Sequence, residues 1–153
     1  MRRAVLDSNA VDPFIDLTGA QDVVRVAVRS GQLELLFTHV NIDELAATPD
    51  ADRRSRLLLA LVDFGHLVPT GAFAVDFSRL GHARLMDDAD VVEALRSRNV
   101  DHTRDALIAS TAVFEKCALV TNEKRLTARA RDRGIEVLSS LDLLHELGFT
   151  SNP

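Results

Sequence analysis

Residues 4–7 read Ala-Val-Leu-Asp, a short apolar run that ends in an acid, Asp7. An apolar run of this length is typical of a buried strand, and a carboxylate at its end is costly unless it faces solvent, a partner or a cation. Three further acids lie beside apolar runs, namely Glu44, Asp105 and Glu123. One such acid is ordinary, but four in matching contexts predict a cluster of carboxylates.

Short apolar runs alternate along the chain with longer segments of helical period, which indicates an α/β fold. We expect strands at 4–6, 35–38, 66–68, 118–121 and 135–138. We expect helices at 22–29, 50–62, 101–116, 126–132 and 141–147, with a helical insert at 73–85 and 87–96. Near-continuous apolar strands separated by helices predict a central parallel five-stranded sheet with helices on both faces. The whole forms a single expected domain over residues 1–150.

Composition narrows the class of protein further. A chain of 153 residues with 46% hydrophobic and 27% charged residues fits one soluble domain. No apolar stretch reaches the roughly 18 residues of a membrane span, so we expect a cytoplasmic protein that does not enter a membrane. Cys117 is the only cysteine, which excludes an internal disulfide and a thiolate zinc site. A net charge of -5 argues against nucleic-acid binding by bulk attraction, unless cations reverse the local sign at the acidic cluster.

The expected place of the acids suggests their chemistry. Sites in doubly wound sheets form at the carboxyl ends of strands, where these acids fall. Mg²⁺ and Mn²⁺ favour oxygen ligands, so the cluster suits metal-dependent phosphodiester hydrolysis. The alternative is structural: Glu44 and Asp105 would be acids at the start of helices, favoured by the helix dipole, and Glu123 a turn residue.

Four stretches in this order resemble the signature stretches of PIN domains, and the similarity covers residues 1–147. They are Val5-Leu6-Asp7-Ser8-Asn9, the segment 38–44, Asp105-Ala106-Leu107-Ile108-Ala109-Ser110-Thr111-Ala112, and Leu119-Val120-Thr121-Asn122-Glu123-Lys124-Arg125-Leu126. The resemblance implies a single PIN-like nuclease domain, a Mg²⁺- or Mn²⁺-dependent endoribonuclease. A PIN domain of this size resembles the VapC-type toxin of a toxin–antitoxin pair. Its implied partners are an RNA substrate, a cognate antitoxin and a second copy of the chain.

On this resemblance the catalytic residues are Asp7, Glu44, Asp105 and Glu123, with Asp7 and Asp105 as metal ligands. Glu123 departs from the common Thr-Asn-Asp form of the fourth stretch, because it carries an extra methylene group. Direct ligation by Glu123 is therefore open, while ligation through water remains easy.

Polar and basic neighbours extend the expected site. Ser8, Thr121 and Asn122 are candidates to hold the carboxylates or metal-bound water, although hydrogen bonding at strand ends explains the hydroxyl groups equally well. The candidate RNA-binding residues are Arg104, Lys124, Arg125 and Arg129. A solvated helix face is the competing explanation for the basic segment after Glu123. Asp101 is expected as a helix N-cap rather than a ligand.

Other enzyme classes lack their motifs. A haloacid-dehalogenase-type phosphatase needs a second Asp where Asn9 stands. The chain has no glycine-rich nucleotide loop and no G-x-S-x-G elbow. The remaining alternative is a PIN-like module that binds RNA or protein without cleavage, and Glu123 is the residue that keeps it open.

Overall fold

The computed structural model describes residues 1–71 and 103–150, and its centre is a parallel five-stranded sheet in the order β3-β2-β1-β4-β5. The strands are β1 (Arg2–Leu6), β2 (Leu33–Phe37), β3 (Gly65–Leu67), β4 (Ala118–Val120) and β5 (Val137–Leu138). Every neighbouring pair is parallel. The predicted five-stranded α/β architecture is therefore confirmed. The predicted insert at 73–96 and Asp101 lie outside the described residues.

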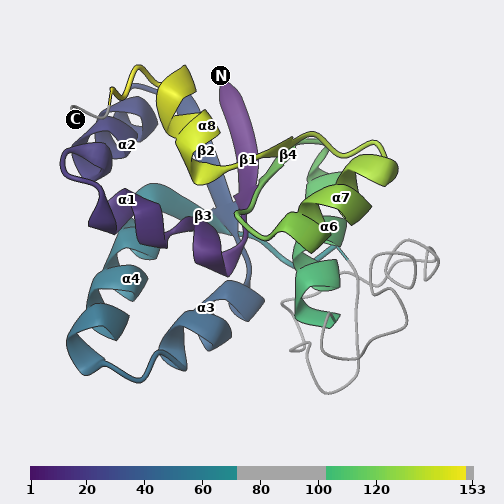
Figure 1. The fold of residues 1–153 in the computed structure, drawn as a ribbon, viewed down its shortest axis with the longest axis horizontal. Helices are drawn as coiled ribbons and strands as arrows, with labels where there is room; N and C mark the ends of the chain where they lie inside the picture. Colours follow the sequence, from purple (N-terminus) through teal and green to yellow (C-terminus); the bar gives the residue numbers. More distant parts are fainter. Residues whose placement is uncertain (72–102, 151–153) are drawn as a thin grey trace.

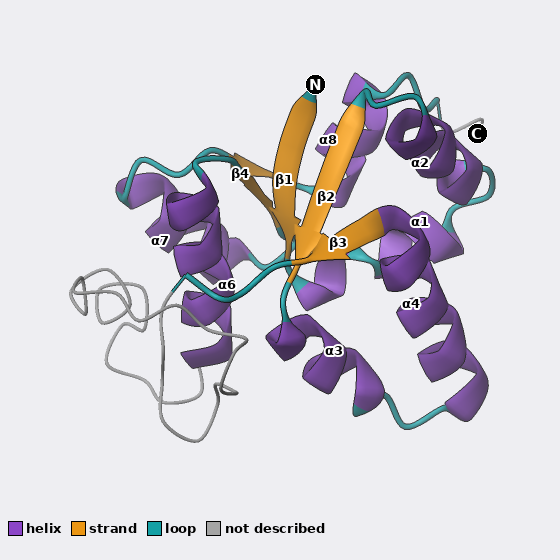
Figure 2. Cartoon of the chain, turned by 180° about the vertical axis from the view of Figure 1, so that it is seen from behind, coloured by secondary structure: helices purple, strands orange, loops and turns teal. Residues whose placement is uncertain are grey.

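Helices cover both faces of the sheet, as the apolar strands predicted (Figure 1 and Figure 2). They are η1 (Ser8–Ala10), α1 (Asp12–Asp16), α2 (Ala20–Arg29), α3 (His39–Ala46), α4 (Ala51–Phe64), α6 (Thr103–Glu115), α7 (Lys124–Asp132) and α8 (Ser140–Glu146). None of these helices is long and apolar enough to cross a bilayer.

Alternation along β1 divides the core into two layers. Ala4 and Leu6 belong to the cluster that includes buried residues of α1, α2, α4 and α8. Val5 belongs to the other cluster, with buried residues of α6 and α7. The centre of β1 is thus buried on both sides, which explains why its sequence is a continuous apolar run rather than an alternating one.

The element bounds depart from the sequence expectation in informative places. α1 was not predicted, and α3 is a helix of eight residues in which Glu44 lies near the end rather than the beginning. α7 begins at Lys124, two residues before the expected start, because Glu123 caps it. β3 covers Gly65–Leu67 instead of 66–68.

The strand order places a reversal beside the central strand. From β1 the chain continues to β2 and β3 on one side, then crosses to β4 and β5 on the other. The loops after β1 and β4 therefore lead away in opposite directions at the carboxyl end of the sheet. Such reversal points are where α/β sheets form binding sites.

The chain after β3 is fixed against α6 by a close backbone approach. A Cβ atom at Gly71 would lie 2.2 Å from the Ser110 carbonyl oxygen. The Gly71 N–H also donates to Oγ1 of Thr111 at 3.0 Å. Only glycine fits here, so this contact fixes how the middle of the chain meets the helix that carries Asp105.

Candidate functional site

The structure places the four predicted acids around the carboxyl end of the sheet. Asp7 directly follows β1, and Glu123 lies in the loop after β4. Glu44 belongs to α3, which follows β2, and Asp105 to the first turn of α6. The charge of Asp7 interacts with those of Glu44, Asp105 and Glu123. The charges of Glu44 and Asp105 also interact with each other. Four segments that are distant in sequence therefore contribute to one acidic centre.

Asp7 is the buried centre of this group, with 3% of its surface exposed. Its Oδ1 accepts from the Ser8 N–H at 2.8 Å, and its Oδ2 accepts from the Thr121 hydroxyl at 2.6 Å. Burial raises the pKa of Asp7 to about 6, the charges of Asp105 and Glu123 add to the rise, and the two hydrogen bonds oppose it. The fold thus holds this carboxylate in place despite unfavourable surroundings for its charge.

Glu44 is in a similar position on α3. Burial raises the pKa of Glu44 to about 7, with the charges of Asp7 and Asp105 acting in the same direction. The charge of Arg104 and a side-chain hydrogen bond with Ser8 oppose that rise. Because Glu44 lies near the carboxyl end of its helix, the helix dipole disfavours it there. The structural alternative, an acid that begins a helix, is therefore wrong for Glu44.

Asp105 is half-buried in the first turn of α6, as predicted. The helix dipole favours an acid at this point, so its position has a structural explanation as well as a functional one. The next residues toward the sheet, Ala106 and Ala109, are fully buried and small. They allow α6 to lie close to the sheet, which brings Asp105 toward Asp7.

Glu123 differs from the other three acids because both of its carboxylate oxygens bind the backbone of the helix that it caps. It is the N-cap of α7, and its Oε1 accepts from the Arg125 N–H at 3.0 Å, while Oε2 accepts from the Leu126 N–H. Both carboxylate oxygens therefore satisfy backbone donors at the start of α7. The structural alternative for this residue is a helix cap rather than a simple turn, although its charge still reaches Asp7.

Asn41 supports the site and was not identified from the sequence. This side chain is completely buried between α3 and the end of β1. Its Nδ2 donates to the Leu6 carbonyl oxygen at 2.8 Å and to Oγ of Ser8 at 3.3 Å. The only sequence signal was a polar residue within an apolar stretch, three positions before Glu44.

A second polar network positions the loop after β4. Nδ2 of Asn122 donates to Oγ of Ser140 at 2.9 Å and to the Asn9 carbonyl oxygen at 3.3 Å. The Asn122 N–H donates to Oδ1 of Asn9 at 3.1 Å, and the Ser140 hydroxyl donates to the Ala10 carbonyl oxygen at 2.8 Å. Asn122 thus holds the loop rather than a carboxylate, while Ser8 and Thr121 do contact Asp7.

The acidic group suits a divalent cation in its chemistry. Within residues 1–71 and 103–150, no three Asp, Glu, His or Cys side chains are grouped so that they could hold a metal ion. Mg²⁺, however, commonly takes one or two carboxylates and keeps several waters, so three protein ligands are not required. Oε1 of Glu44 is buried without a hydrogen-bond partner among the described residues. An unpaired carboxylate oxygen beside other acids is what a hydrated cation would satisfy.

The basic residues after Glu123 are of two kinds. Lys124 and Arg125 are exposed at the start of α7. Arg129 is half-buried, and its Nε and Nη2 atoms are buried without a hydrogen-bond partner in the described part of the chain. These two atoms form one edge of the guanidinium group, the edge that binds a carboxylate or phosphate in a bidentate manner. A solvated helix face accounts for the first two residues but not for Arg129.

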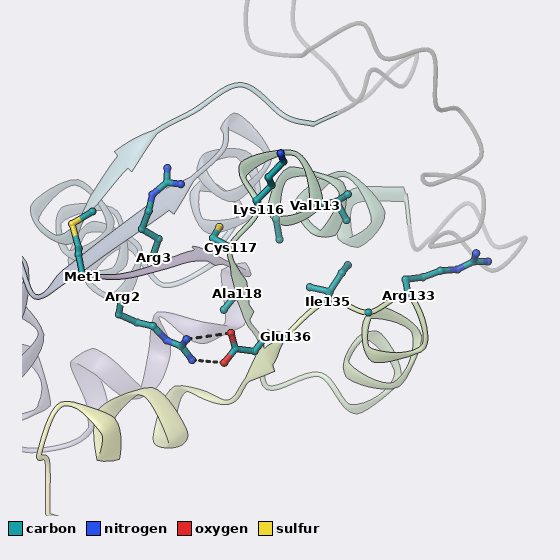
Figure 3. A pocket seen from close by; sticks show the side chains of 12 residues that line it. Met1, Arg2, Arg3, Val113, Lys116, Cys117, Ala118, Arg133, Ile135 and Glu136 are labelled. Atoms are coloured by element: carbon teal, nitrogen blue, oxygen red, sulfur yellow. Dashed lines mark hydrogen bonds and ion pairs between the residues drawn. The ribbon is translucent and has the colours of Figure 1, made fainter.

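A hollow of about 540 Å³ lies at the opposite, amino end of the sheet (Figure 3). Arg2, Lys116 and Arg133 are among its lining residues, with Ile135 and Glu136. Arg2 forms an ion pair with Glu136 at 2.6 Å, which Figure 3 shows. Lys116 and Arg133 directly follow the last residues of α6 and α7, where cations balance the helix dipole. Its cations therefore have structural explanations, unlike Glu44 at the other end.

Comparison with known proteins gives structural matches only. No known protein-family profile and no curated protein sequence matches the chain. The fold is similar to that of PAE2754 from Pyrobaculum aerophilum, with a TM-score of 0.61 and 18% identity over 96% of this chain and 97% of that one. It is similar to VapBC2 from Rickettsia felis, a structure with a promoter DNA fragment, with a TM-score of 0.54 and 12% identity over 90% and 98% of the chains. VapBC-1 from nontypeable Haemophilus influenzae matches with a TM-score of 0.50 and 13% identity over 91% and 98%.

These matches establish the fold. They cover nearly the whole of both chains, so the likeness extends over the sheet and its helices rather than over one motif. The expected resemblance to a VapC-type PIN domain is thereby confirmed in the fold. At such low sequence identity these matches show the fold alone. An argument about activity must come from the residues at the site.

Proposed function

We propose that the chain is a Mg²⁺- or Mn²⁺-dependent endoribonuclease. The observation that carries the proposal is Asp7, a buried carboxylate held by Ser8 and Thr121 among other acids at the carboxyl end of the sheet. Strongly perturbed carboxylates in such a position are typical of functional sites. Burial and mutual repulsion of these acids destabilise the fold, so a role in cation binding is the simplest explanation of the cluster.

The roles follow from the placement of each carboxylate. Asp7 and Asp105 would hold the cation, and Glu44, with its unpaired Oε1, would accept a hydrogen bond from the attacking water. Glu123 caps α7 and adds negative charge without a free oxygen. The bound cation would activate the water and stabilise the charge on the phosphate. The water oxygen would form a bond to phosphorus as the water gives a proton to Glu44, the bond to the leaving ribose oxygen would break, and that oxygen would take a proton from solvent.

The basic residues supply a path for the RNA backbone. Lys124 and Arg125 offer exposed charges to the backbone phosphates. The Nε and Nη2 atoms of Arg129 are buried, so Arg129 would bind a phosphate through this guanidinium edge only after its side chain moved to the surface. Arg104 lies beside Asp105 and interacts with Glu44, so it can bind the phosphate nearest the acids. The net charge of -5 is compatible with this arrangement because several cations lie together on α7 and the acids would be neutralised by metal.

An antitoxin is the proposed protein partner. The fold is shared with VapBC2 and VapBC-1, and the resemblance to VapC-type toxins implies a cognate antitoxin. Here α2 and α4 expose large apolar side chains, with Val26 67%, Leu59 70% and Val62 69% exposed. An amphipathic segment of the antitoxin would cover these side chains. A homodimer stays a prediction from the resemblance. Light scattering of the purified protein measures the oligomeric state and so tests it.

The test is cleavage of an RNA pool by the wild type and by Asp7→Asn. We expect cleavage that requires Mg²⁺ or Mn²⁺, stops with excess EDTA, and falls at least about a hundredfold in the variant, since a ligand should matter more than its supporting residues. Circular dichroism of the Asp7→Asn variant should show an intact fold. Full activity in EDTA, or equal cleavage by Asp7→Asn, contradicts the proposal. RNA binding without cleavage by the wild type would favour the non-catalytic module.

A further inference from the structure

We propose that Asn41 is a positioning residue of the acidic site, which fixes Leu6 and Ser8 on either side of Asp7 and so holds the Asp7 carboxylate. The inference rests on the proposed function and adds a residue that acts through another. It depends on the hydrogen bonds of one buried amide. Each of its polar atoms has an identified partner, and these partners determine the orientation of the group.

The Asn41 amide can adopt only one orientation. Its Oδ1 accepts from the Thr38 N–H at 2.7 Å and from the Thr38 hydroxyl at 3.1 Å. Its Nδ2 donates to the Leu6 carbonyl oxygen at 2.8 Å. A backbone N–H can only donate and a carbonyl oxygen can only accept, so exchanging the amide oxygen and nitrogen would break both backbone bonds.

This orientation determines what Ser8 can do. The second Nδ2 donor of Asn41 is directed at Oγ of Ser8 at 3.3 Å, where Ser8 is the acceptor. The Ser8 N–H in turn donates to Oδ1 of Asp7 at 2.8 Å. Ser8 is only 6% exposed, so bulk water does not compete for its bond to Asn41. Asn41 therefore holds the residue whose backbone binds the Asp7 carboxylate.

Asn41 also fixes the distance between two segments of the site. Leu6 and Ser8, its partners across the site, flank Asp7 on both sides in the sequence. Asn41 lies three residues before Glu44 and therefore on the same side of α3. One side chain thus connects the helix of Glu44 to the strand end that carries Asp7.

The start of α8 shows that helix capping alone does not require an amide. Asp142 occupies the third position of α8, as Asn41 does in α3. Its Oδ2 accepts from the Ser139 N–H at 2.9 Å, which matches the Oδ1 bond of Asn41. A carboxylate therefore suffices for the cap. The amide is needed in α3 only because a donor must also reach Leu6 and Ser8.

The experiment measures Mn²⁺ binding by electron paramagnetic resonance, without RNA. Asn41→Ala should weaken Mn²⁺ binding about tenfold, as expected when a group that orients a ligand is lost. Ser8→Ala should have a similar effect, and the double variant should be no weaker than either single one, because both remove the same interaction. Asp142→Ala is the matched control, since it removes the same capping bond in α8 and should leave Mn²⁺ affinity unchanged.

A second substitution covers the risk that Asn41→Ala does not fold. Asn41→Ser keeps an acceptor for the Thr38 N–H, but it is too short to reach both Leu6 and Ser8, so it should also bind Mn²⁺ more weakly. Unchanged affinity in both Asn41 variants, additive losses in the double variant, or no Mn²⁺ binding by the wild type overturns the inference. Weaker binding by Asn41→Ala in a protein that cleaves no RNA supports the positioning role and contradicts the nuclease function.

Discussion

The two ends of β1 differ in how their charged side chains are surrounded. At the amino end, Arg2 pairs with Glu136, and Arg3 pairs with Glu34 at 2.5 Å and Glu115 at 3.4 Å. At the carboxyl end, Asp7 is surrounded by carboxylates, and burial together with their charges raises its pKa to about 6. The first end combines opposite charges at the surface; the second concentrates like charges in the interior.

This difference separates stability from function. Partly exposed ion pairs of this kind each contribute little to stability. A buried group of like charges destabilises the folded chain and persists only where another role requires it. Substitutions at the amino end should therefore alter stability alone, whereas those at the carboxyl end should alter activity and, without metal, can stabilise the protein.

The largest effect should come from Asp105→Ala, compared with Glu123→Ala. Asp105 has a short side chain in an ordered helical turn and can meet the strict geometry of Mg²⁺, so its loss should remove cleavage, by at least about a hundredfold. Glu123 already binds two backbone N–H groups, so Glu123→Ala should weaken metal affinity and helix capping but leave turnover at high Mn²⁺. Cleavage rates titrated with Mn²⁺ measure both variants.

Glu123→Asp is the control for this pair. It keeps the charge and a capping acceptor, because Asp is a favoured N-cap residue, so activity should be retained or improved. If Glu123→Ala is as inactive as Asp105→Ala at saturating Mn²⁺, Glu123 is a direct ligand and the ranking is wrong.

An intermediate effect should appear in the pH dependence of stability without metal. Burial raises the pKa of Asp7 to about 6 and that of Glu44 to about 7, both above their unfolded values. The stabilising contribution of these groups to the free energy of unfolding is therefore fully present below about pH 4 and is lost as pH rises through about pH 7. Asp7→Asn should raise the free energy of unfolding at about pH 8, on the order of 1–2 kcal/mol, and much less at about pH 4.5.

Urea unfolding in EDTA, followed by circular dichroism at both pH values, measures this difference. Saturating Mg²⁺ should stabilise the wild type and not the variant, which reverses their order. A variant that is less stable than the wild type at the higher pH without metal would show that the hydrogen bonds to Ser8 and Thr121 outweigh the charge repulsion.

The smallest effect is expected at the amino end. Arg3→Ala removes the ion pairs with Glu34 and Glu115 and should lower the free energy of unfolding by about 1 kcal/mol or less, because these pairs are partly exposed. The deficit should shrink in high salt, and RNA cleavage should not change. Urea titrations at low and high salt measure the first two effects, and a change in cleavage would contradict the separation of the two ends.

Local patterns were sufficient to predict the sheet. A strand buried on both faces must be apolar throughout, so β1 and β4 were recognisable from their residues alone. α3 was harder, because it is short and its buried positions include polar residues, His39 and Asn41. The position of Glu44 within that helix consequently could not be predicted.

The parts of the site that escaped prediction depend on distant partners. Asn41 bonds to Leu6 and Ser8, which are 35 and 33 residues away in the sequence. The hydrogen bonds of Glu123 to the first N–H groups of α7 depend on where that helix begins. Helix ends are the least predictable feature of a sequence. By contrast, the residue types at the strand ends were enough to nominate the four acids, since parallel strands bring such positions together.

The hydrogen bond between Thr121 and Asp7 has a consequence for synthesis, because it joins residues 114 positions apart. β4 can take its place beside β1 only after most of the chain has been translated, and contacts of such separation form late in folding. A nascent chain that ends before residue 118 has no Thr121 hydroxyl for Asp7 and neither β4 nor α7. The acidic centre is therefore completed only when translation is nearly finished.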